Sequence, residues 1–292
     1  MPPAPSSPLP AILLVVVAMS IVSLQDATVK YLATVMPAVQ VTWARYFFHL
    51  LFALPLALRG TPWRVLARPV NVPLQLMRSF LMVASSFLFV IGVRHVPLAD
   101  MLALVMSAPL IVTALSPLLL GERVGPRRFA ACAVGFLGAL LIIKPGAGTM
   151  QWSSLLGLLA GTSFSLYLII TRKLAGTVAP MAGLAYAALI GAGATTAMLP
   201  FVWVTPAPFH LLLMVGIGLT ASVAHYLIIR AYELAPAAVL APFNYAEIVG
   251  ATILGFLIFG DFPDATTWAG IAVIVGSGIY ISFRERKLAK AA

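Results

Sequence analysis

The feature that most constrains this chain is a series of ten apolar stretches, each close to the length that crosses a lipid bilayer. A transmembrane helix needs about 20 consecutive apolar residues. Because 62% of the 292 residues are hydrophobic and only 9% are charged, a soluble globular domain is excluded. We therefore expect an all-α polytopic protein of the cell membrane, which in a bacterium is the inner membrane. The apolar stretches, bounded by proline, glycine and charged residues, predict ten transmembrane helices over residues 9–31, 39–58, 74–93, 98–120, 127–143, 155–173, 181–203, 211–231, 237–259 and 266–283.

The basic residues predict the orientation of these spans. If the N-terminus is cytoplasmic, the inner loops and the C-terminal tail hold thirteen Lys and Arg residues, whereas the outer loops hold only Arg94 and Lys144. Lys and Arg are retained on the cytoplasmic side, so both termini are expected there. The net charge of +10 then marks one side of a membrane, and nucleic acid is not an expected partner. Cys132 is the only cysteine, which excludes an intramolecular disulfide and a cysteine-cluster metal site; no metal or other cofactor is expected.

An internal repeat relates the two halves of the chain. Each half holds five spans, an odd number, so the second copy enters the membrane upside down, and inverted repeats of this kind are typical of carriers that alternate access to a midplane site. A gapless shift of 139 residues aligns Pro97 with Pro236, Thr113 with Thr252, Gly121 with Gly260 and Glu122 with Asp261. The expected organisation is an N-terminal tail (1–8), a first five-helix repeat (9–143), an outer linker (144–154), a second five-helix repeat (155–283) and a basic cytoplasmic tail (284–292).

Charged residues inside the spans are candidates for the functional site, because a charge at the bilayer centre is costly unless it faces a cavity or a partner. Glu247 is the only acid near a midplane, and it follows Pro242, which loosens the helix there. Its neighbours Asn244 and Tyr245 are candidates with it. We expect Glu247 either to exchange protons or to bind a substrate ammonium; the alternative is a protonated side chain hydrogen-bonded between helices.

Asp26 and Lys30 lie four residues apart on one face of the first span, so they can form an ion pair with each other. In the alternative, Arg45 of the second span competes for Asp26 and leaves a switchable gate or an anion-binding cluster. Arg78, near the inner end of the third span, is expected to reach lipid headgroups. Asp100 is expected to cap the fourth span. No pair of neighbouring carboxyl groups is expected within the spans.

His225 lies in the inner half of the eighth span, where it can hydrogen-bond a neighbouring helix or relay a proton. Tyr167 and Tyr245 can stack on a flat solute or hold a cation, although aromatic residues in spans more often serve packing. The candidate substrate-binding or coupling residues are therefore Glu247, Arg45, Asp26, Lys30, Tyr245, Asn244, Tyr167 and His225.

The first half contains Ala108-Pro109-Leu110, Leu120-Gly121-Glu122-Arg123-Val124, Arg128 and the 135–138 glycine run, and the second half contains the 157–174 stretch with Tyr167, Arg172 and Lys173. These motifs resemble the EamA-type fold of the drug/metabolite transporter superfamily. The second copy departs from them, with Asp261-Phe262-Pro263 where the first has Glu122-Arg123-Val124. The resemblance implies a carrier of amino acids, vitamins, nucleotide-like metabolites or drugs. The segment 25–30, with Gln40 and Arg45, is similar to a branch linked to uptake of riboflavin or S-adenosylmethionine.

These observations favour a secondary carrier that moves a small organic metabolite by alternating access, with a proton or a counter-solute as a candidate second partner. The protein is expected to act as a monomer or a homodimer. It lacks a Gly-x-x-x-x-Gly-Lys-Ser/Thr phosphate loop, so it does not hydrolyse ATP itself. The alternatives are a flippase for lipids or lipid-linked solutes and, less favoured, an intramembrane lipid-modifying enzyme. An enzyme is not expected, because His-Glu-x-x-His and Gly-x-Ser-x-Gly motifs are missing.

Overall fold

The computed structural model describes residues 9–60, 62–121, 124–144, 152–177 and 179–289, and within these ranges the chain is helical and contains no strand. The expected N-terminal tail, most of the 144–154 linker, and Glu122 and Arg123 lie outside the described residues. The elements are α1 (Leu9–Val35), α2 (Ala38–Gly60), α3 (Trp63–Leu66), α4 (Val72–Val93), α5 (Leu98–Val105), α6 (Ala108–Leu119), α7 (Pro126–Ile143), α8 (Ser153–Lys173), α9 (Pro180–Met198), the 3-10 helix η1 (Leu199–Phe201), α10 (Pro208–Leu234), α11 (Ala237–Leu240), the 3-10 helix η2 (Ala241–Tyr245), α12 (Ala246–Phe259) and α13 (Ala265–Ala289).

Ten helical segments of the described chain are long and apolar enough to cross a membrane, and they coincide with the ten predicted spans. Two helices continue past their predicted ends, because no helix-breaking residue lies there. α1 continues four residues past the predicted end, because the first residue unable to extend it is Pro37. α13 continues to Ala289 through the segment expected to be a tail, which contains no glycine or proline.

Two of the spans are broken near their centres. The fourth span consists of α5 and α6, with Pro109 at the start of α6. In the ninth span, η2 contains Pro242 and gives way to α12, which begins at Ala246. Proline removes a backbone donor and clashes with the preceding turn, so it favours such interruptions. The shift of 139 residues pairs Ala108 with Glu247, so the two half-helices begin within one residue of equivalent positions.

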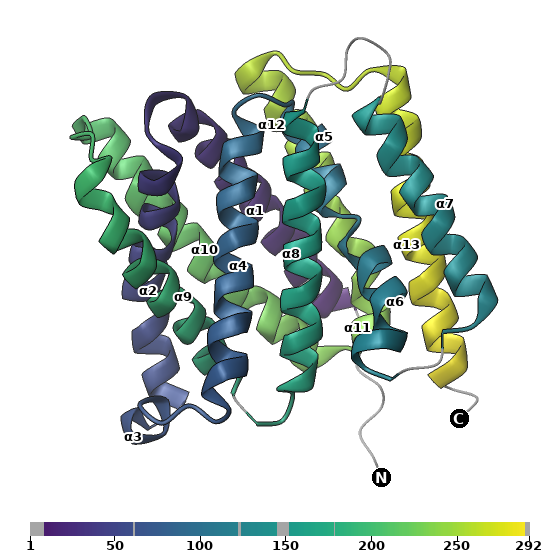
Figure 1. Cartoon of the computed structure of the whole chain (residues 1–292), viewed down its shortest axis with the longest axis horizontal. Coiled ribbons are helices and arrows are strands. Elements are labelled where there is room, and N and C mark those ends of the chain that lie inside the picture. Colours follow the sequence, from purple (N-terminus) through teal and green to yellow (C-terminus); the bar gives the residue numbers. More distant parts are fainter. Residues whose placement is uncertain (1–8, 61, 122–123, 145–151, 178, 290–292) are drawn as a thin grey trace.

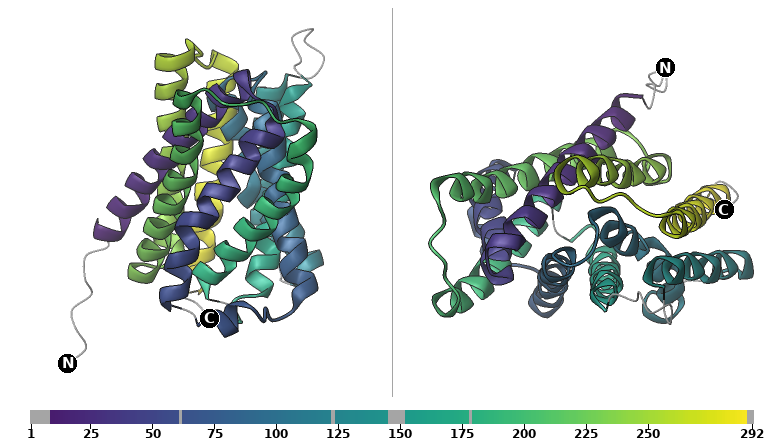
Figure 2. Two further views of the ribbon diagram at one scale, coloured as in Figure 1. Left: turned by 90° about the vertical axis from the view of Figure 1, so that its left-hand side faces the viewer. Right: turned by 90° about the horizontal axis from the view of Figure 1, so that it is seen from above.

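Both the first turn of α1 and the last turns of α13 lie at one end of the bundle, which we call the terminal end (Figure 1). The α1–α2, α4–α5 and α12–α13 connections lie at the opposite end, which we call the far end. α4 packs along α8, α1 along α10, α2 along α9, and α7 along α13. Seen from above in Figure 2, α4 and α8 stand side by side across the bundle from α10.

The largest apolar cluster lies between these layers. It joins α1, α2, α4 and α5 to α8, α10 and α12, and its fully buried side chains include Leu32, Met101 and Met214. Burial of such side chains fixes the helices that surround the polar cavity described below.

Candidate functional site

A cavity of about 180 Å³ lies within the bundle, bounded by α1, α2, α4, α5, α8, α10 and α12. A smaller cavity of about 20 Å³ shares Arg45, Met82 and His225 with it. The polar residues lining the larger cavity are Gln25, Asp26, Arg45, Ser85, Ser86, His225 and Glu247. Its apolar lining is Met19, Val22, Met82, Phe89, Leu102, Val105, Met106, Phe164 and Ile228.

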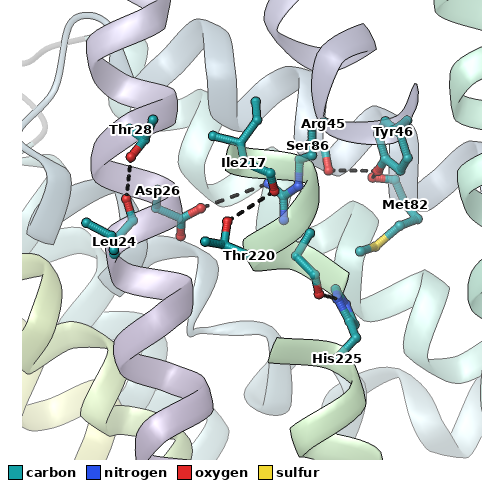
Figure 3. A network of polar contacts seen from close by, with 11 residues as sticks. Leu24, Asp26, Thr28, Arg45, Tyr46, Met82, Ser86, Ile217, Thr220 and His225 are labelled. Carbon is teal, nitrogen blue, oxygen red and sulfur yellow. Dashed lines mark hydrogen bonds and ion pairs between the residues drawn. The ribbon is translucent and has the colours of Figure 1, made fainter. Parts of the chain in front are cut away.

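Asp26, Arg45 and Glu247 form a charged cluster on the wall of this cavity. The Asp26 and Glu247 side chains are 4% and 6% exposed, and their carboxyl groups lie beside each other. Arg45 Nη1 lies 3.9 Å from Asp26 Oδ1, which is an ion pair but too long for a hydrogen bond (Figure 3). One guanidinium therefore stands against two carboxyl groups.

The break in the ninth span places Glu247 on the cavity wall. Glu247 is in the first turn of α12, where the helix dipole favours a negative charge. Ser23 of α1 donates a hydrogen bond from Oγ to the Glu247 carbonyl oxygen at 2.9 Å. At Gly250 a Cβ atom would lie 2.4 Å from Ser23 Oγ, so the glycine permits the close crossing of α1 and α12. This crossing brings Asp26 and Glu247 together.

Hydrogen bonds hold the neighbouring helices in register around Arg45. Tyr46 Oη lies 2.8 Å from Ser86 Oγ and 3.0 Å from the Met82 carbonyl oxygen, which ties α2 to α4 (Figure 3). His225 Nδ1 lies 2.7 Å from the Ala221 carbonyl oxygen, within its own helix. His225, one of the candidates from the sequence, lines both cavities.

Tyr167 lines the smaller cavity and stacks on Phe164, which lines the larger one; the ring centroids are 5.6 Å apart and the planes 16° apart. Five of the eight candidate residues thus border one or both cavities: Glu247, Arg45, Asp26, His225 and Tyr167.

Within the described ranges, no group of three His, Cys, Asp or Glu side chains is placed to hold a metal ion.

The structure does not bring Lys30 to the cavity, and the pairing of Lys30 with Asp26 is wrong. Lys30 Nζ lies 2.5 Å from Asp261 Oδ2, donates to the Val96 carbonyl oxygen at 3.0 Å, and sits 4.9 Å from the centre of the Phe259 ring. These partners belong to the far end of the bundle. The alternative, in which Arg45 takes Asp26, fits the observed geometry.

Tyr245 and Asn244 also lie away from the cavity, although they precede Glu247 directly. Tyr245 points toward α13, where a Cβ atom on Gly278 would lie 1.8 Å from its hydroxyl oxygen. Asn244 Nδ2 lies 3.4 Å from the Tyr232 hydroxyl oxygen. Neither side chain lines the cavity that Glu247 borders.

Arg78 was expected to reach lipid headgroups, and this prediction is wrong. The residue is 5% exposed, and its Nη2 donates to the Gly183 carbonyl oxygen of α9 at 2.8 Å. Asp100 lies in the first turn of α5 but does not cap it as predicted, because Pro97 is the N-cap residue and no side chain makes a capping hydrogen bond there. Asp100 instead accepts a hydrogen bond from Thr267 Oγ1 at 3.4 Å.

Two features of the cavity were missed from the sequence. The Asp26 and Glu247 carboxyl groups are neighbours, contrary to the expectation that no carboxyl pair occurs in the spans. No local spacing signals this pair, because the two residues lie on spans far apart in the chain. Gln25 lines the cavity beside Asp26; its place inside an apolar span is a signal, because polar side chains are costly there.

Comparisons with known proteins agree with the fold. A model of the EamA-like transporter family matches residues 9–144 and 151–283. An S-adenosylmethionine uptake transporter of Rickettsia bellii (strain RML369-C) is 27% identical over 91% of this chain and 90% of its own length. A riboflavin transporter of Rhizobium johnstonii is 31% identical over 86% of this chain and 83% of its own length. A solved crystal structure with 19% sequence identity superposes with a TM-score of 0.66 over 98% of this chain and 99% of that one, a likeness of fold.

Proposed function

The chain belongs to the EamA-like transporter family, and from that premise we propose that it is a secondary carrier that moves a small metabolite by alternating access. The observation that carries the proposal is the cavity of about 180 Å³ with Asp26, Arg45 and Glu247 on its wall. Charged groups are maintained inside a membrane protein chiefly where they face a partner, a substrate or an ion pathway. The chain is a multi-pass membrane protein, and the bacterial relatives favour the inner membrane as its location.

Charge balance favours coupling to a proton or to a cationic group of the solute. With both carboxyl groups ionised, the cluster carries one more negative charge than Arg45 neutralises. Either a proton or the ammonium or sulfonium group of a substrate balances it. Replacement of one by the other at one face of the membrane, and the reverse replacement at the opposite face, is the elementary step of exchange between a proton and such a solute.

A flat nitrogen heterocycle is the substrate feature that we favour. The two relatives described above are named for S-adenosylmethionine and for riboflavin, and both compounds contain such a ring. The aromatic and aliphatic part of the cavity lining suits a ring, while the charged cluster suits a polar or cationic remainder. We place the substrate of this chain in that class.

The packing supports the inverted repeat that alternating access would use. Exchanging each span with its counterpart five spans later converts the α1–α10 contact into the α8–α4 contact, and both are among the most extensive in the bundle. The α2–α9 and α7–α13 contacts convert into themselves. With the excess of Lys and Arg in the terminal-end loops, we place that end in the cytoplasm.

Exchange in proteoliposomes tests the proposal. Vesicles are loaded with amino acids, flavins and nucleoside-like metabolites, and flux is followed across a pH series in wild type, Glu247→Gln and Glu233→Gln. Glu233 is an exposed acid paired with Arg230, so its variant is the matched control. We expect pH-dependent exchange in wild type and in the control, and lost or pH-independent exchange in Glu247→Gln.

Full pH-dependent exchange in Glu247→Gln would contradict the coupling role of that carboxyl group. Lipid scrambling by the wild type without flux of any solute would contradict the carrier itself and favour the flippase alternative.

A further inference from the structure

The side chain of Gln25 stands apart from the other polar groups on the cavity wall. Its residue is 2% exposed, it lines the cavity, and its Nε2 has no hydrogen-bond partner within the described part of the chain. The remaining polar side chains there have partners. Asp26 lies beside Glu247 and pairs with Arg45. The others are hydrogen-bonded as follows: Ser85 Oγ to the Ala160 carbonyl (2.9 Å), Ser86 Oγ with Tyr46 Oη (2.8 Å) and His225 Nδ1 with the Ala221 carbonyl (2.7 Å).

Gln40 shows what a glutamine amide does in this fold when a partner is present. Its Nε2 donates to the Val204 carbonyl oxygen at 2.7 Å, and its Oε1 accepts from the Val204 backbone N–H at 2.9 Å. The glutamine amide thus pairs with the backbone N–H and carbonyl groups of one residue, donor to acceptor and acceptor to donor. Gln25 carries the same donor and acceptor groups, but it lines the cavity, and its Nε2 has no acceptor within the described residues.

We infer that Gln25 binds the hydrogen-bonding edge of a flat nitrogen heterocycle in the substrate, while the Asp26–Arg45–Glu247 cluster holds the charged or polar remainder. The inference rests on the proposed function and adds the residue that recognises the ring. The unpartnered Nε2 of Gln25 disfavours an empty or purely apolar cavity, because a buried donor without an acceptor is costly. A ring edge with adjacent donor and acceptor, as in adenine or in the pyrimidine-dione part of a flavin, satisfies both halves of the amide.

The rest of the lining fits a ring beside Gln25. Phe89 and Phe164 line the same cavity, and Phe164 is held by its stacking on Tyr167. The volume of about 180 Å³ corresponds to the space of about six water molecules in the liquid. That is enough for a small ring system. Waters in this space can satisfy the Gln25 amide when no substrate is bound, and a matching ring edge can replace them without loss of hydrogen bonds.

The test removes the amide and the ring edge separately. Exchange of riboflavin and of S-adenosylmethionine is measured in proteoliposomes of wild type, Gln25→Met and Gln75→Met. Methionine retains the length of glutamine and lacks both hydrogen-bonding groups. Gln75 is the matched control, because it is equally buried and its amide also has no partner within the described ranges, yet it does not line the cavity.

Each variant is also given ring-blocked analogues, N3-methylriboflavin and an S-adenosylmethionine analogue dimethylated on the exocyclic amine. For the substrate that wild type exchanges, we expect Gln25→Met to raise KM about tenfold, the loss of ~1.4 kcal/mol in binding. We expect wild type and Gln75→Met to discriminate against the blocked analogue, and Gln25→Met to accept both forms equally. A merely structural role for Gln25 would not remove this discrimination.

The possible failures are distinguishable. If wild type exchanges a substrate and Gln25→Met retains both its KM and its discrimination against the blocked analogue, the role of Gln25 is overturned while the carrier function stands. If wild type exchanges neither compound but exchanges other solutes, the heterocycle class is wrong and this inference falls with it. If wild type exchanges no solute, the proposed function itself fails.

Discussion

Arg45 supplies the single positive charge that faces two buried carboxyl groups. We expect Arg45→Gln to reduce exchange at least about tenfold, or ~1.4 kcal/mol, because it leaves Asp26 and Glu247 without a cation. The double variant Arg45→Gln/Glu247→Gln leaves one buried carboxyl group without a cation, whereas Arg45→Gln leaves two. The double variant should therefore unfold at a higher temperature than Arg45→Gln alone. Thermal unfolding in detergent and exchange in vesicles measure the two effects.

Arg59→Gln is the control for this comparison, because Arg59 is an exposed arginine in the last turn of the same helix, α2. It should leave exchange and unfolding temperature nearly unchanged. Equal unfolding temperatures of Arg45→Gln and the double variant would contradict the charge balance that we describe.

The sequence indicated which residues to examine more reliably than which residues meet. Depth within a span identified Asp26, Arg45 and Glu247, because charges in apolar helices are rare and costly. The contact between Asp26 and Glu247 depends on how α1 crosses α12, which no local pattern encodes. Lys30 was assigned to Asp26 from helical spacing, but its flexible stem reaches the stronger partner Asp261 on another element.

At the scale of helices, close contacts depend on particular glycines. On α9, a Cβ atom at Gly191 would lie 2.5 Å from the ring of Tyr46, whereas at Gly193 nothing lies within 4 Å. We expect Gly191→Ala to destabilise the protein by about 1–3 kcal/mol through overpacking. Because Tyr46 also holds Ser86 at the cavity, exchange should fall as well.

Gly193→Ala is the matched control, two residues along the same helix. It should be neutral or slightly stabilising, since alanine favours helix more than glycine. Thermal unfolding of the two variants in the same detergent separates overpacking from helix propensity. An equal effect of both substitutions would show that the contact with Tyr46 does not limit how closely α9 approaches α2.

The breaks in two spans illustrate what proline can predict. Pro242 was expected to loosen the ninth span, and the structure has a 3-10 segment there. Pro55 and Pro117, by contrast, lie inside continuous helices. Proline removes one hydrogen bond in every case, and the surrounding packing decides whether the helix then breaks or continues.

At the scale of the whole molecule, two ion pairs join the halves of the chain across the far end. Lys144, which follows α7, forms an ion pair with Asp264, which precedes α13. The Lys144 ammonium holds the pKa of the Asp264 carboxyl below its usual range. Hydrogen bonds from the Thr267 backbone N–H and the Thr266 hydroxyl to the same carboxyl act in the same direction. A lowered pKa means that this pair is formed above the ordinary pKa of an aspartate and is lost only in stronger acid.

The Asp264 carboxyl therefore does not titrate near neutral pH. We expect Asp264→Asn to preserve the pH profile of exchange between pH 5 and about 8, the range in which most proteins are most stable, whereas Glu247→Gln abolishes it. If Asp264→Asn made exchange independent of pH, the pH-sensing group would lie at the far end and not at the cavity.

The second pair, Lys30 with Asp261, is more buried and joins α1 to the α12–α13 link, so we expect it to hold the far end closed. The lysine side chain is 8% exposed and the aspartate 31%, against 26% and 56% for Lys144 and Asp264. Exposed pairs contribute about 0–1 kcal/mol, so the buried pair should dominate the closure. We expect Asp261→Asn to shift the carrier toward a state open at the far end, and Asp264→Asn to do so much less.

Cysteine labelling measures this opening and the orientation together. In a Cys132→Ser background, Leu98→Cys places a fully buried thiol at the start of α5, close to Gly255 of α12. A membrane-impermeant maleimide added to intact cells should label this thiol slowly, and several-fold faster after Asp261→Asn, because the separation of α1 from the α12–α13 link exposes it. The same reagent added to inside-out membrane vesicles reports labelling from the cytoplasmic side. Unchanged labelling on both sides of the membrane would contradict the closure by Lys30 and Asp261. Faster labelling only from the cytoplasmic side would retain the closure and reverse the proposed orientation.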